Sequence, residues 1–116
     1  MFVNDNLSKV HISTSSDGIT FERVGNIVTF KMRKNIYDVA ANWTYDNQCV
    51  IPNGYRPCNQ SIFAVGLHVS DRTITGSFYI LLETNGTTHL VSNLTHKDGR
   101  TYIATCTYPT TDEILS

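Results

Sequence analysis

The sequence predicts an all-β fold, in the form of a small antiparallel β-barrel or a jelly-roll-like sandwich. Short runs rich in Val, Ile, Thr, Phe and Tyr, which suit a pleated sheet, recur along the chain. Turn dipeptides separate these runs, and no long window keeps the apolar period of an amphipathic helix. Many short strands within one small domain are typical of sandwiches and barrels.

The turn dipeptides set the boundaries of the expected strands, because Gly, Asn and Asp readily adopt turn conformations. They are Asp17-Gly18, Gly25-Asn26, Asn53-Gly54, Asn85-Gly86 and Asp98-Gly99. The expected strands, in chain order, are Lys9–Ser13, Ile19–Val24, Ile27–Arg33, Ile36–Ala41, Ser61–Val69, Thr73–Glu83, Thr87–Ser92 and Thr101–Tyr108. We expect one domain over residues 1–116, with polar ends at 1–8 and 110–116 that fray.

A two-residue loop at Gly25-Asn26 fixes the register of the first hairpin, because Val24 then faces Ile27. Opposed residues share a face of the sheet, so apolar and polar side chains separate onto different sides. One side carries Ile19, Phe21, Val28, Phe30 and Met32, and the other carries Thr20, Glu22, Thr29 and Lys31. This pattern predicts one buried and one solvated face.

The hairpin around Asn85-Gly86 gives a different pattern when these two residues are taken as its loop. Pairing Thr84 with Thr87 puts Ile80, Leu82, His89 and Val91 on one face, and Tyr79, Leu81, Leu90 and Ser92 on the other. A lone histidine on an apolar face is usually a hydrogen-bonded core residue, and we expect this of His89. The face with Tyr79, Leu81 and Leu90 would be covered by an extra loop or, as we favour, by another subunit.

Composition excludes several classes of function. The chain has 116 residues and 13.0 kDa, the size of one domain, and only 16% of its residues are charged. Its net charge of −1 provides no electrostatic basis for binding nucleic acid or an anionic membrane. No apolar run is long enough to span a bilayer, and Met1–Val10 lacks the charged start and apolar middle of a signal peptide.

The three cysteines, Cys49, Cys58 and Cys106, cannot all pair within the chain. Cys49 and Cys58 flank a turn-rich stretch, so that a disulfide between them is conceivable. Free cysteine behaves as a small apolar residue, and three free thiols are the interpretation we favour. Cys106 falls in the middle of an expected strand, where a structural thiol is a better explanation than a nucleophile.

The common motifs of catalytic and metal sites are missing from the sequence. There is no nucleophile elbow, zincin motif, P-loop or dinucleotide-binding glycine motif. A glycosidase pair such as Asp71 and Glu83 would need two carboxyls facing one cleft, and their spacing does not argue for it. The histidines and cysteines also lack the spacings of metal ligands. We therefore expect no enzymatic activity, no metal and no cofactor.

The remaining chemical signal is binding through aromatic and amide side chains. The stretch 42–48 contains the single tryptophan, Trp43, together with a tyrosine, two asparagines, an aspartate and a glutamine. Sugars are bound by such mixtures, because aromatic faces stack on C–H patches while planar polar groups bind hydroxyl pairs. The alternative is a Trp43 buried at the end of the sheet. A second polar segment, 70–73, follows His68, and its alternative is a simple solvated turn.

Several segments resemble the receptor-binding head domains of phage tails from Gram-positive hosts, in particular lactococcal ones. The segment Gly18–Phe30 resembles their first hairpin, and Trp43 followed by Ile51–Pro57 resembles their Trp … Leu/Val-Pro-x-x-Tyr/Phe-x-Pro element. Phe63–Gly66 and Thr101–Thr110 fit the same heads. The match extends from about Gly18 to Thr110, and its specificity comes from the order of these elements.

The resemblance implies a β-barrel or jelly-roll-like trimeric head that recognises a saccharide of the host cell wall without cleaving it. Partners would be two further copies of the chain and other tail or baseplate proteins, reached through an N-terminal part missing here. The protein would be made in the host cytoplasm and carried at the tail tip of the virion. In such heads, strand positions corresponding to Tyr79 and Leu81 help to hold the sugar, and Leu81 cannot replace a polar ligand.

We expect the saccharide site on the loop-bearing end of the head, near a subunit boundary. Its candidate residues are Trp43, His68, Asp71, Arg72 and Tyr79, which offer aromatic faces, a carboxylate and a planar guanidinium. Two alternatives remain: a structural or trimerisation domain of a tail fibre without a receptor, and a secreted carbohydrate-binding module. Glycan binding distinguishes the proposal from the first alternative, and the neighbouring genes distinguish it from the second.

Overall fold

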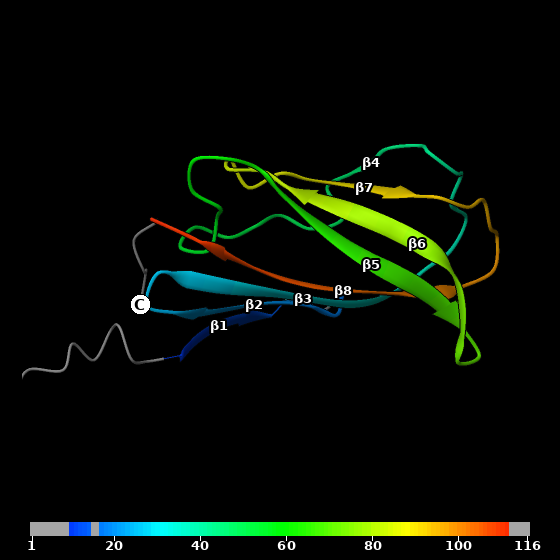
Figure 1. The fold of residues 1–116 in the computed structure, drawn as a ribbon, viewed down its shortest axis with the longest axis horizontal. Coiled ribbons are helices and arrows are strands. Elements are labelled where there is room, and N and C mark those ends of the chain that lie inside the picture. Colours follow the sequence, from blue (N-terminus) through cyan, green and yellow to red (C-terminus); the bar gives the residue numbers. More distant parts are fainter. Residues whose placement is uncertain (1–9, 15–16, 112–116) are drawn as a thin grey trace, which may run out of the picture.

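The computed structural model describes residues 10–14 and 17–111, and these residues form an all-β fold (Figure 1). A single eight-stranded antiparallel sheet curls into a half-barrel, and the described residues contain no helix. The strands are β1 (Val10–Thr14), β2 (Ile19–Val24), β3 (Ile27–Ile36), β4 (Tyr45–Asp46), β5 (Ile62–Ser70), β6 (Thr73–Leu82), β7 (Thr88–Ser92) and β8 (Arg100–Pro109). Their order across the sheet is β1-β2-β3-β8-β5-β6-β7-β4.

Strand β8 joins the two walls of the half-barrel. It pairs with β3 along its whole length, from Ile27 opposite Pro109 to Ile36 opposite Arg100. On its other edge it pairs with β5, where Gly66 faces Ala104. The walls β1-β2-β3-β8 and β5-β6-β7-β4 therefore lie over one another, with the core between them (Figure 1).

Alternate residues of every long strand point into this core, as the side-chain period of a strand requires. Fully buried inner-face residues include Ile19, Val28, Phe30, Ile80, Leu82 and Tyr102. The first hairpin has the predicted register, with Phe21 opposite Phe30 and Val24 opposite Ile27. Its inner face also carries Arg23, whose guanidinium donates hydrogen bonds to the carbonyls of Gly54 (2.6 Å) and Gly25 (2.8 Å).

The predicted register of the β6–β7 hairpin is wrong by one residue. Leu82 pairs with Thr88, and Ile80 pairs with Leu90, so that Leu90 and Ser92 are buried with Ile80 and Leu82. The loop is longer than two residues, because the Gly86 amide donates to the Glu83 carbonyl and Gly86 takes a φ of 93°. A turn followed by a left-handed glycine adds a residue to the hairpin and shifts the pairing.

The expected strand over Ile36–Ala41 is also wrong. Strand β3 continues to Ile36, and the chain then turns at Asp38, whose φ is 57°. Only an isolated bridge between Val39 and His96 remains in this stretch. The short β4, which pairs Tyr45 with Leu90 at the edge of the sheet, was not expected from the sequence.

The segment between β4 and β5 closes the open side of the half-barrel at the end that carries the β6–β7 turn. Ile51 is buried in the core, and its amide donates to the Gly86 carbonyl. Tyr55 packs against Phe21, and its carbonyl accepts the hydroxyl of Tyr108 at 2.6 Å. The Ile51–Pro57 element on which the family resemblance partly rests therefore has a structural role.

All three cysteines are free, so no bridge joins Cys49 to Cys58. Burial raises the pKa of Cys49, and it raises the pKa of Cys106 to about 11. A thiol with a raised pKa is a poor nucleophile at neutral pH. Cys106 packs against the core, which agrees with a structural thiol.

Candidate functional site

The structure places the five predicted site residues in three separate regions. His68 lies in the core, Asp71 and Arg72 form the tip of the β5–β6 hairpin, and Tyr79 and Trp43 lie on or beside the outer surface of β6 and β7. From Arg72 to Tyr79 the chain runs along β6, a separation of about 20 Å at the rise of an extended strand. The five residues therefore do not form one site.

His68 is fully buried, so the expectation that it contacts a ligand from the surface is not met. Its ring stacks on Tyr102 with centroids 4.9 Å apart and bonds the hydroxyls of Thr75 and Ser92 through its two nitrogens. Burial is the main cause that lowers its pKa, which favours the neutral ring. Gly76 lies opposite on β6 and leaves room for the ring.

The pairing of His68 with Ser92 does not make a catalytic dyad. The Ser92 Oγ lies 3.2 Å from His68 Nε2, but both residues are fully buried and Ser92 also donates to the Leu94 carbonyl. A nucleophile must reach a substrate from a cleft, and this hydroxyl lies beneath the surface. Among the described residues, no cluster of three His, Cys, Asp or Glu side chains is placed to hold a metal ion, and no helix is long and apolar enough to cross a membrane.

Asp71 and Arg72 form a tight two-residue turn between Ser70 and Thr73, at the end of a hairpin that projects beyond the sheet (Figure 1). Both have a left-handed backbone, with φ of 48° and 64°, as in a type I′ turn. Glycine or asparagine is usual at such positions, and an arginine there carries some backbone strain. Both side chains are exposed.

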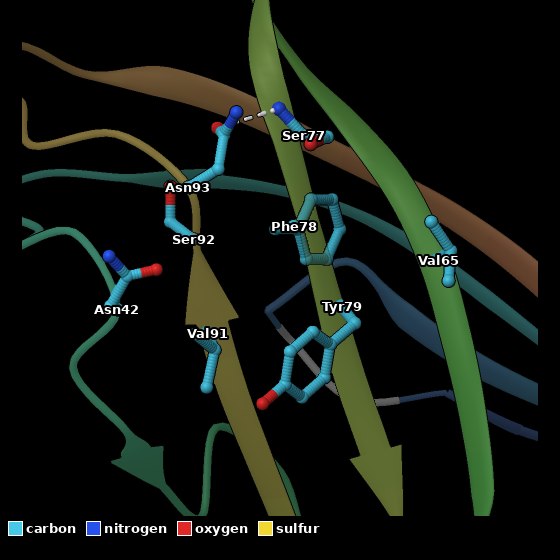
Figure 2. Close-up of a pocket in the computed structure, with 8 residues that line it drawn as sticks. All are labelled: Asn42, Val65, Ser77, Phe78, Tyr79, Val91, Ser92 and Asn93. Atoms are coloured by element: carbon cyan, nitrogen blue, oxygen red, sulfur yellow. Dashed lines mark hydrogen bonds between the residues drawn. The ribbon is translucent and has the colours of Figure 1, made fainter.

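A shallow pocket of about 180 Å³ lies on the outer surface over β6 and β7 (Figure 2). A row of directly paired residues crosses it, with Val65 opposite Tyr79 and Tyr79 opposite Val91. Phe78 and Ser92 lie beneath, while Asn42, Ser77 and Asn93 form the rim. We call these eight residues the β6–β7 pocket. None of them is charged, so the pocket suits a neutral ligand.

Tyr79 is 36% exposed and leans toward Val91 (Figure 2). Its ring meets Phe63 edge-on, with centroids 5.1 Å apart, which fixes one side of the ring and leaves the other toward the pocket. Among the described residues, its hydroxyl has no hydrogen-bond partner. The alternation of β6 positions this residue, because Tyr79 faces outward between the buried Phe78 and Ile80.

Asn42 reaches the pocket from the loop between β3 and β4, and Trp43 follows it in the chain without lining the pocket. The Asn42 amide donates to the Ser92 carbonyl at 2.8 Å, and the Ala41 amide donates to Thr95 Oγ1 at 2.9 Å, so the loop is attached to the end of β7 and to the segment that follows it. The side-chain amide of Asn42 has no partner within the part of the chain that is described, and it faces the pocket (Figure 2). Trp43 is 66% exposed, which contradicts the alternative of a buried tryptophan.

His89, whose ring lies between two carboxylates, is two residues before Val91 on β7 and therefore on the same face of the strand. His89 Nδ1 lies 2.6 Å from Asp46 Oδ1, and His89 Nε2 lies 2.8 Å from Glu83 Oε2. The hydrogen bond with Asp46 and then that with Glu83 raise the pKa of His89. The hydrogen bonds from Thr87 and His89 lower the pKa of Glu83. His89 is therefore an outward-facing residue that ties β4 to β7, and its expected place in the core was wrong.

The outer face beyond the pocket is apolar. Phe63, Val65 and Leu67 on β5 are 59%, 70% and 44% exposed, and Leu81 and Ile103 flank them on β6 and β8. We call these five residues the convex apolar face. A groove of about 330 Å³ follows it between β5 and β8, and Val65 borders both this groove and the β6–β7 pocket. Contiguous exposed apolar surface is typical of interaction sites.

Of the five predicted site residues, only Tyr79 lines the pocket. The sequence analysis noted Asn42 within the stretch 42–48 but did not include it, Asn93 or the apolar row among the site residues. The available signal was the alternation along β6, which places Tyr79 outward while Phe78 and Ile80 point inward. No protein-family model matches the chain, and no curated protein matches it either. The fold and the pocket together define a small all-β module with an uncharged surface site of aromatic and amide side chains.

Proposed function

We propose that the chain is the receptor-binding head of a phage tail or baseplate protein, which attaches the particle to a saccharide on a bacterial surface. The observation that carries the proposal is the β6–β7 pocket, where the Tyr79 hydroxyl and the side-chain amide of Asn42 have no hydrogen-bond partner among the described residues. The exposed Trp43 follows Asn42 in the chain. Aromatic faces and planar amides recognise the C–H patches and hydroxyls of a sugar. The head binds without cleaving, and it needs no metal or cofactor.

The convex apolar face supports assembly of this head into a homotrimer. A monomer would leave Phe63, Val65 and Leu67 in water, at a cost that burial against a second copy removes. Val65 belongs to both the face and the pocket, so the neighbouring subunit would border the saccharide site. Three weak sites on one trimer, and many trimers on one tail, give useful attachment through avidity.

The remaining partners of the proposed head are other tail or baseplate proteins, joined through a segment that precedes this domain. Its location would be the tail tip of the virion after synthesis in the host cytoplasm. These two statements follow from the resemblance of Gly18–Phe30, Ile51–Pro57 and Thr101–Thr110 to phage head domains.

A second candidate function is that of a trimerisation domain of a tail fibre without a receptor. The extent of the convex apolar face favours it, because this face alone would explain self-association. Saccharide binding distinguishes the two candidates.

The test of the proposed function is adhesion of the labelled protein to lactococcal cells and to their extracted wall polysaccharide. Replacing Tyr79 by Ala removes the exposed aromatic ring that lines the pocket, and we expect adhesion to fall about fivefold per site, or more on a multivalent surface. Tyr37→Ala is the matched control, since Tyr37 is 61% exposed and does not line the pocket. Unchanged adhesion for both variants, or none for the parent protein on any wall preparation, would contradict the proposal.

A further inference from the structure

We propose that the core beneath the β6–β7 pocket contains a pH-sensitive switch, in which a neutral His68 keeps the rim of the pocket in place and protonation of its ring in acid opens the rim. The opening is a property of the fold, whereas its effect on attachment rests on the proposed saccharide function. Three features of His68 carry this: its complete burial, its hydrogen bonds and the segment that covers it. That segment, residues 92–96, is called the covering segment.

The hydrogen bonds of the His68 ring determine which nitrogen carries the proton. The Thr75 hydroxyl donates to the His68 carbonyl at 2.8 Å, so it accepts a hydrogen bond from Nδ1–H of the ring at 2.7 Å. In the neutral ring the other nitrogen, Nε2, has a lone pair and lies 3.2 Å from the Ser92 hydroxyl. A proton added at Nε2 would place a full positive charge in a site closed to water.

Two further buried rings lie against His68, and neither supplies a negative charge. The Tyr102 ring stacks on it at 4.9 Å between centroids, and the centroid of His96 lies 5.4 Å away. Burial raises the pKa of Tyr102, so its hydroxyl is neutral, and it lies 2.6 Å from His96 Nε2. His96 donates from Nδ1 to the Asp98 carbonyl at 2.8 Å, because a carbonyl oxygen only accepts. An imidazolium at His68 would therefore have no counter-ion among these rings.

The charged side chains around the three rings are engaged elsewhere or lie in solvent. The Asp98 carboxylate pairs with Arg100 at 3.2 Å, and Lys34 lies 3.8 Å from a carboxylate oxygen of Asp17. The titratable and charged groups that surround the rings are Tyr45 on β4, Lys34 on β3, Arg100 and Tyr102 on β8, and Asp38, His96, Lys97 and Asp98 on the connecting segments. Asp38 and Lys97 are exposed and have opposite charges.

Burial is the largest cause that lowers the pKa of His68, followed by the charges of His96 and Arg100. With a lowered pKa in the folded state, the closed form is fully stable above the ordinary histidine pKa of about 6.5 and loses stability as pH falls below that value. In the open form water reaches the ring, which then takes up its proton at the ordinary pKa. Acid therefore shifts the equilibrium toward the open form.

The covering segment lies over the Nε2 edge of His68 and also holds the rim of the pocket. Ser92, whose hydroxyl faces Nε2, accepts the Asn42 amide on its carbonyl at 2.8 Å. Asn93 Oδ1 accepts the Ser77 amide at 3.0 Å (Figure 2). Displacement of this segment would remove both Asn42 and Asn93 from the pocket.

The covering segment has few attachments beyond Ser92, where β7 ends. An isolated bridge joins His96 to Val39, and Thr95 Oγ1 accepts the Ala41 amide at 2.9 Å. Segments with few backbone hydrogen bonds open at a lower free energy than central strands. Local opening at this end of the sheet is therefore compatible with an intact wall of β2, β3 and β8.

The first test is amide hydrogen exchange of the parent protein between about pH 7.5 and about pH 4.5, corrected for the intrinsic exchange rate. We expect the amides of Asn42, Ser77 and His96 to lose protection about tenfold or more in acid, because their acceptors belong to or face the covering segment. Phe30 and Met32, on a strand paired along both edges, should keep theirs. Equal loss at all five amides, or no loss at any, would overturn the switch.

The ring nitrogens of the parent protein, followed by NMR over the same pH range, identify the group that titrates. We expect His68 to change from the Nδ1–H tautomer to the doubly protonated ring in the pH interval where the three amides lose protection. If the ring protonates while these amides stay protected, or stays neutral while they lose protection, His68 is not the switch.

A variant tests the same assignment independently. His68→Gln keeps a planar polar side chain and removes the titration, so exchange at Asn42, Ser77 and His96 should no longer increase in acid. His11→Gln is the matched control, because His11 lies on β1, away from the covering segment, and this variant should behave as the parent. Acid-dependent exchange in His68→Gln equal to that of the parent would contradict the proposal. The ring measurement does not depend on the folding of either variant.

Adhesion to wall polysaccharide at the same two pH values connects the switch with attachment. We expect adhesion about tenfold weaker in acid and full recovery on return to neutral pH, since the rim closes again. Unchanged adhesion in acid, together with loss of protection, would overturn the effect on attachment. Absence of adhesion at both pH values, with the expected exchange, would mean that the proposed function fails while the switch stands.

Discussion

The histidine between two carboxylates shows how one residue couples the stability of the pocket loop to pH. Both ring nitrogens of His89 face carboxylate oxygens, at 2.6 Å and 2.8 Å, and only the protonated ring donates to both. The groups that face it are Asp46 on β4 and Glu83 after β6, and their hydrogen bonds raise its pKa. β4 closes the loop that carries Asn42 and Trp43, so His89 stabilises the attachment of that loop.

The pH dependence of this contribution has a definite sign. A raised folded pKa means that the stabilisation by His89 is complete below its unfolded pKa of about 6.5 and is lost as pH rises through the folded pKa. His89→Gln should therefore lower the melting temperature by a few degrees at pH 5.5 and by less at pH 9, because exposed ion pairs are weak. Thermal melts at the two pH values test this, with His11→Gln as control. An equal loss of melting temperature at both pH values would contradict stabilisation by a protonated His89.

Gly76 lies against an aromatic ring that cannot move, whereas Gly99 lies against an aromatic ring that can move, so the two glycines can be compared. A Cβ on Gly76 would lie 2.6 Å from the ring of His68, which is fully buried and bonded at both nitrogens. A Cβ on Gly99 would lie 2.5 Å from the ring of Tyr37, which is 61% exposed and can swing away. Gly76→Ala should cost about 1–3 kcal/mol of unfolding free energy, and Gly99→Ala less than about 1 kcal/mol.

Urea denaturation of these two variants measures both values. A loss for Gly99→Ala equal to that for Gly76→Ala would show that the Tyr37 ring is as rigidly held as the core histidine. The comparison also bears on the site, because it tests whether His68 is a core residue. The signal that could have placed His68 inside was in the sequence: a histidine on the same face as Ala64 of β5, with a glycine opposite.

At the scale of elements, local turn chemistry decided which sequence predictions were right. The Gly25-Asn26 turn has a two-residue loop, and its register could be predicted because the alternation on both strands agrees with it. The Asn85-Gly86 turn has a similar sequence, but its loop has one residue more, because Glu83 pairs with Thr87. The Glu83 N–H donates to the Thr87 carbonyl, and the Thr87 hydroxyl donates to the Glu83 carboxylate at 2.7 Å. That one added residue moved Leu90 from the predicted outer face into the core.

Tertiary contacts decided the elements that the sequence could not predict. Strand β4 has two residues, too few for any periodicity, and exists because Tyr45 and Asp46 pair with Leu90 and His89. The stretch 36–41 has the composition of a strand, but Asp38 adopts a left-handed backbone and its amide bonds the Lys97 carbonyl. The pocket depends on both features, because they place Asn42 against β7. Asn42 therefore could not be assigned to the site from the sequence alone.

At the scale of the whole molecule, the open half-barrel has one face that a monomer leaves uncovered. The alternation of β5 turns Phe63, Val65 and Leu67 outward while Ala64 and His68 fill the core. Burying this face against further copies is what the proposed trimer requires, and light scattering at micromolar concentration should give about three times 13.0 kDa. A monomer for the parent protein would contradict both the trimer and the assignment of the convex apolar face as its interface.

Val65 and Val50 provide a matched pair for locating that interface. Each is a valine 70% exposed, but Val65 is central to the convex apolar face whereas Val50 lies in the segment that closes the half-barrel. Val65→Asp would bring uncompensated carboxylates into a desolvated contact, which costs several kcal/mol per assembly, so it should yield a folded monomer. Val50→Asp should leave the trimer intact. Circular dichroism confirms folding of both, and dissociation by Val50→Asp alone would move the interface to the other side of the molecule.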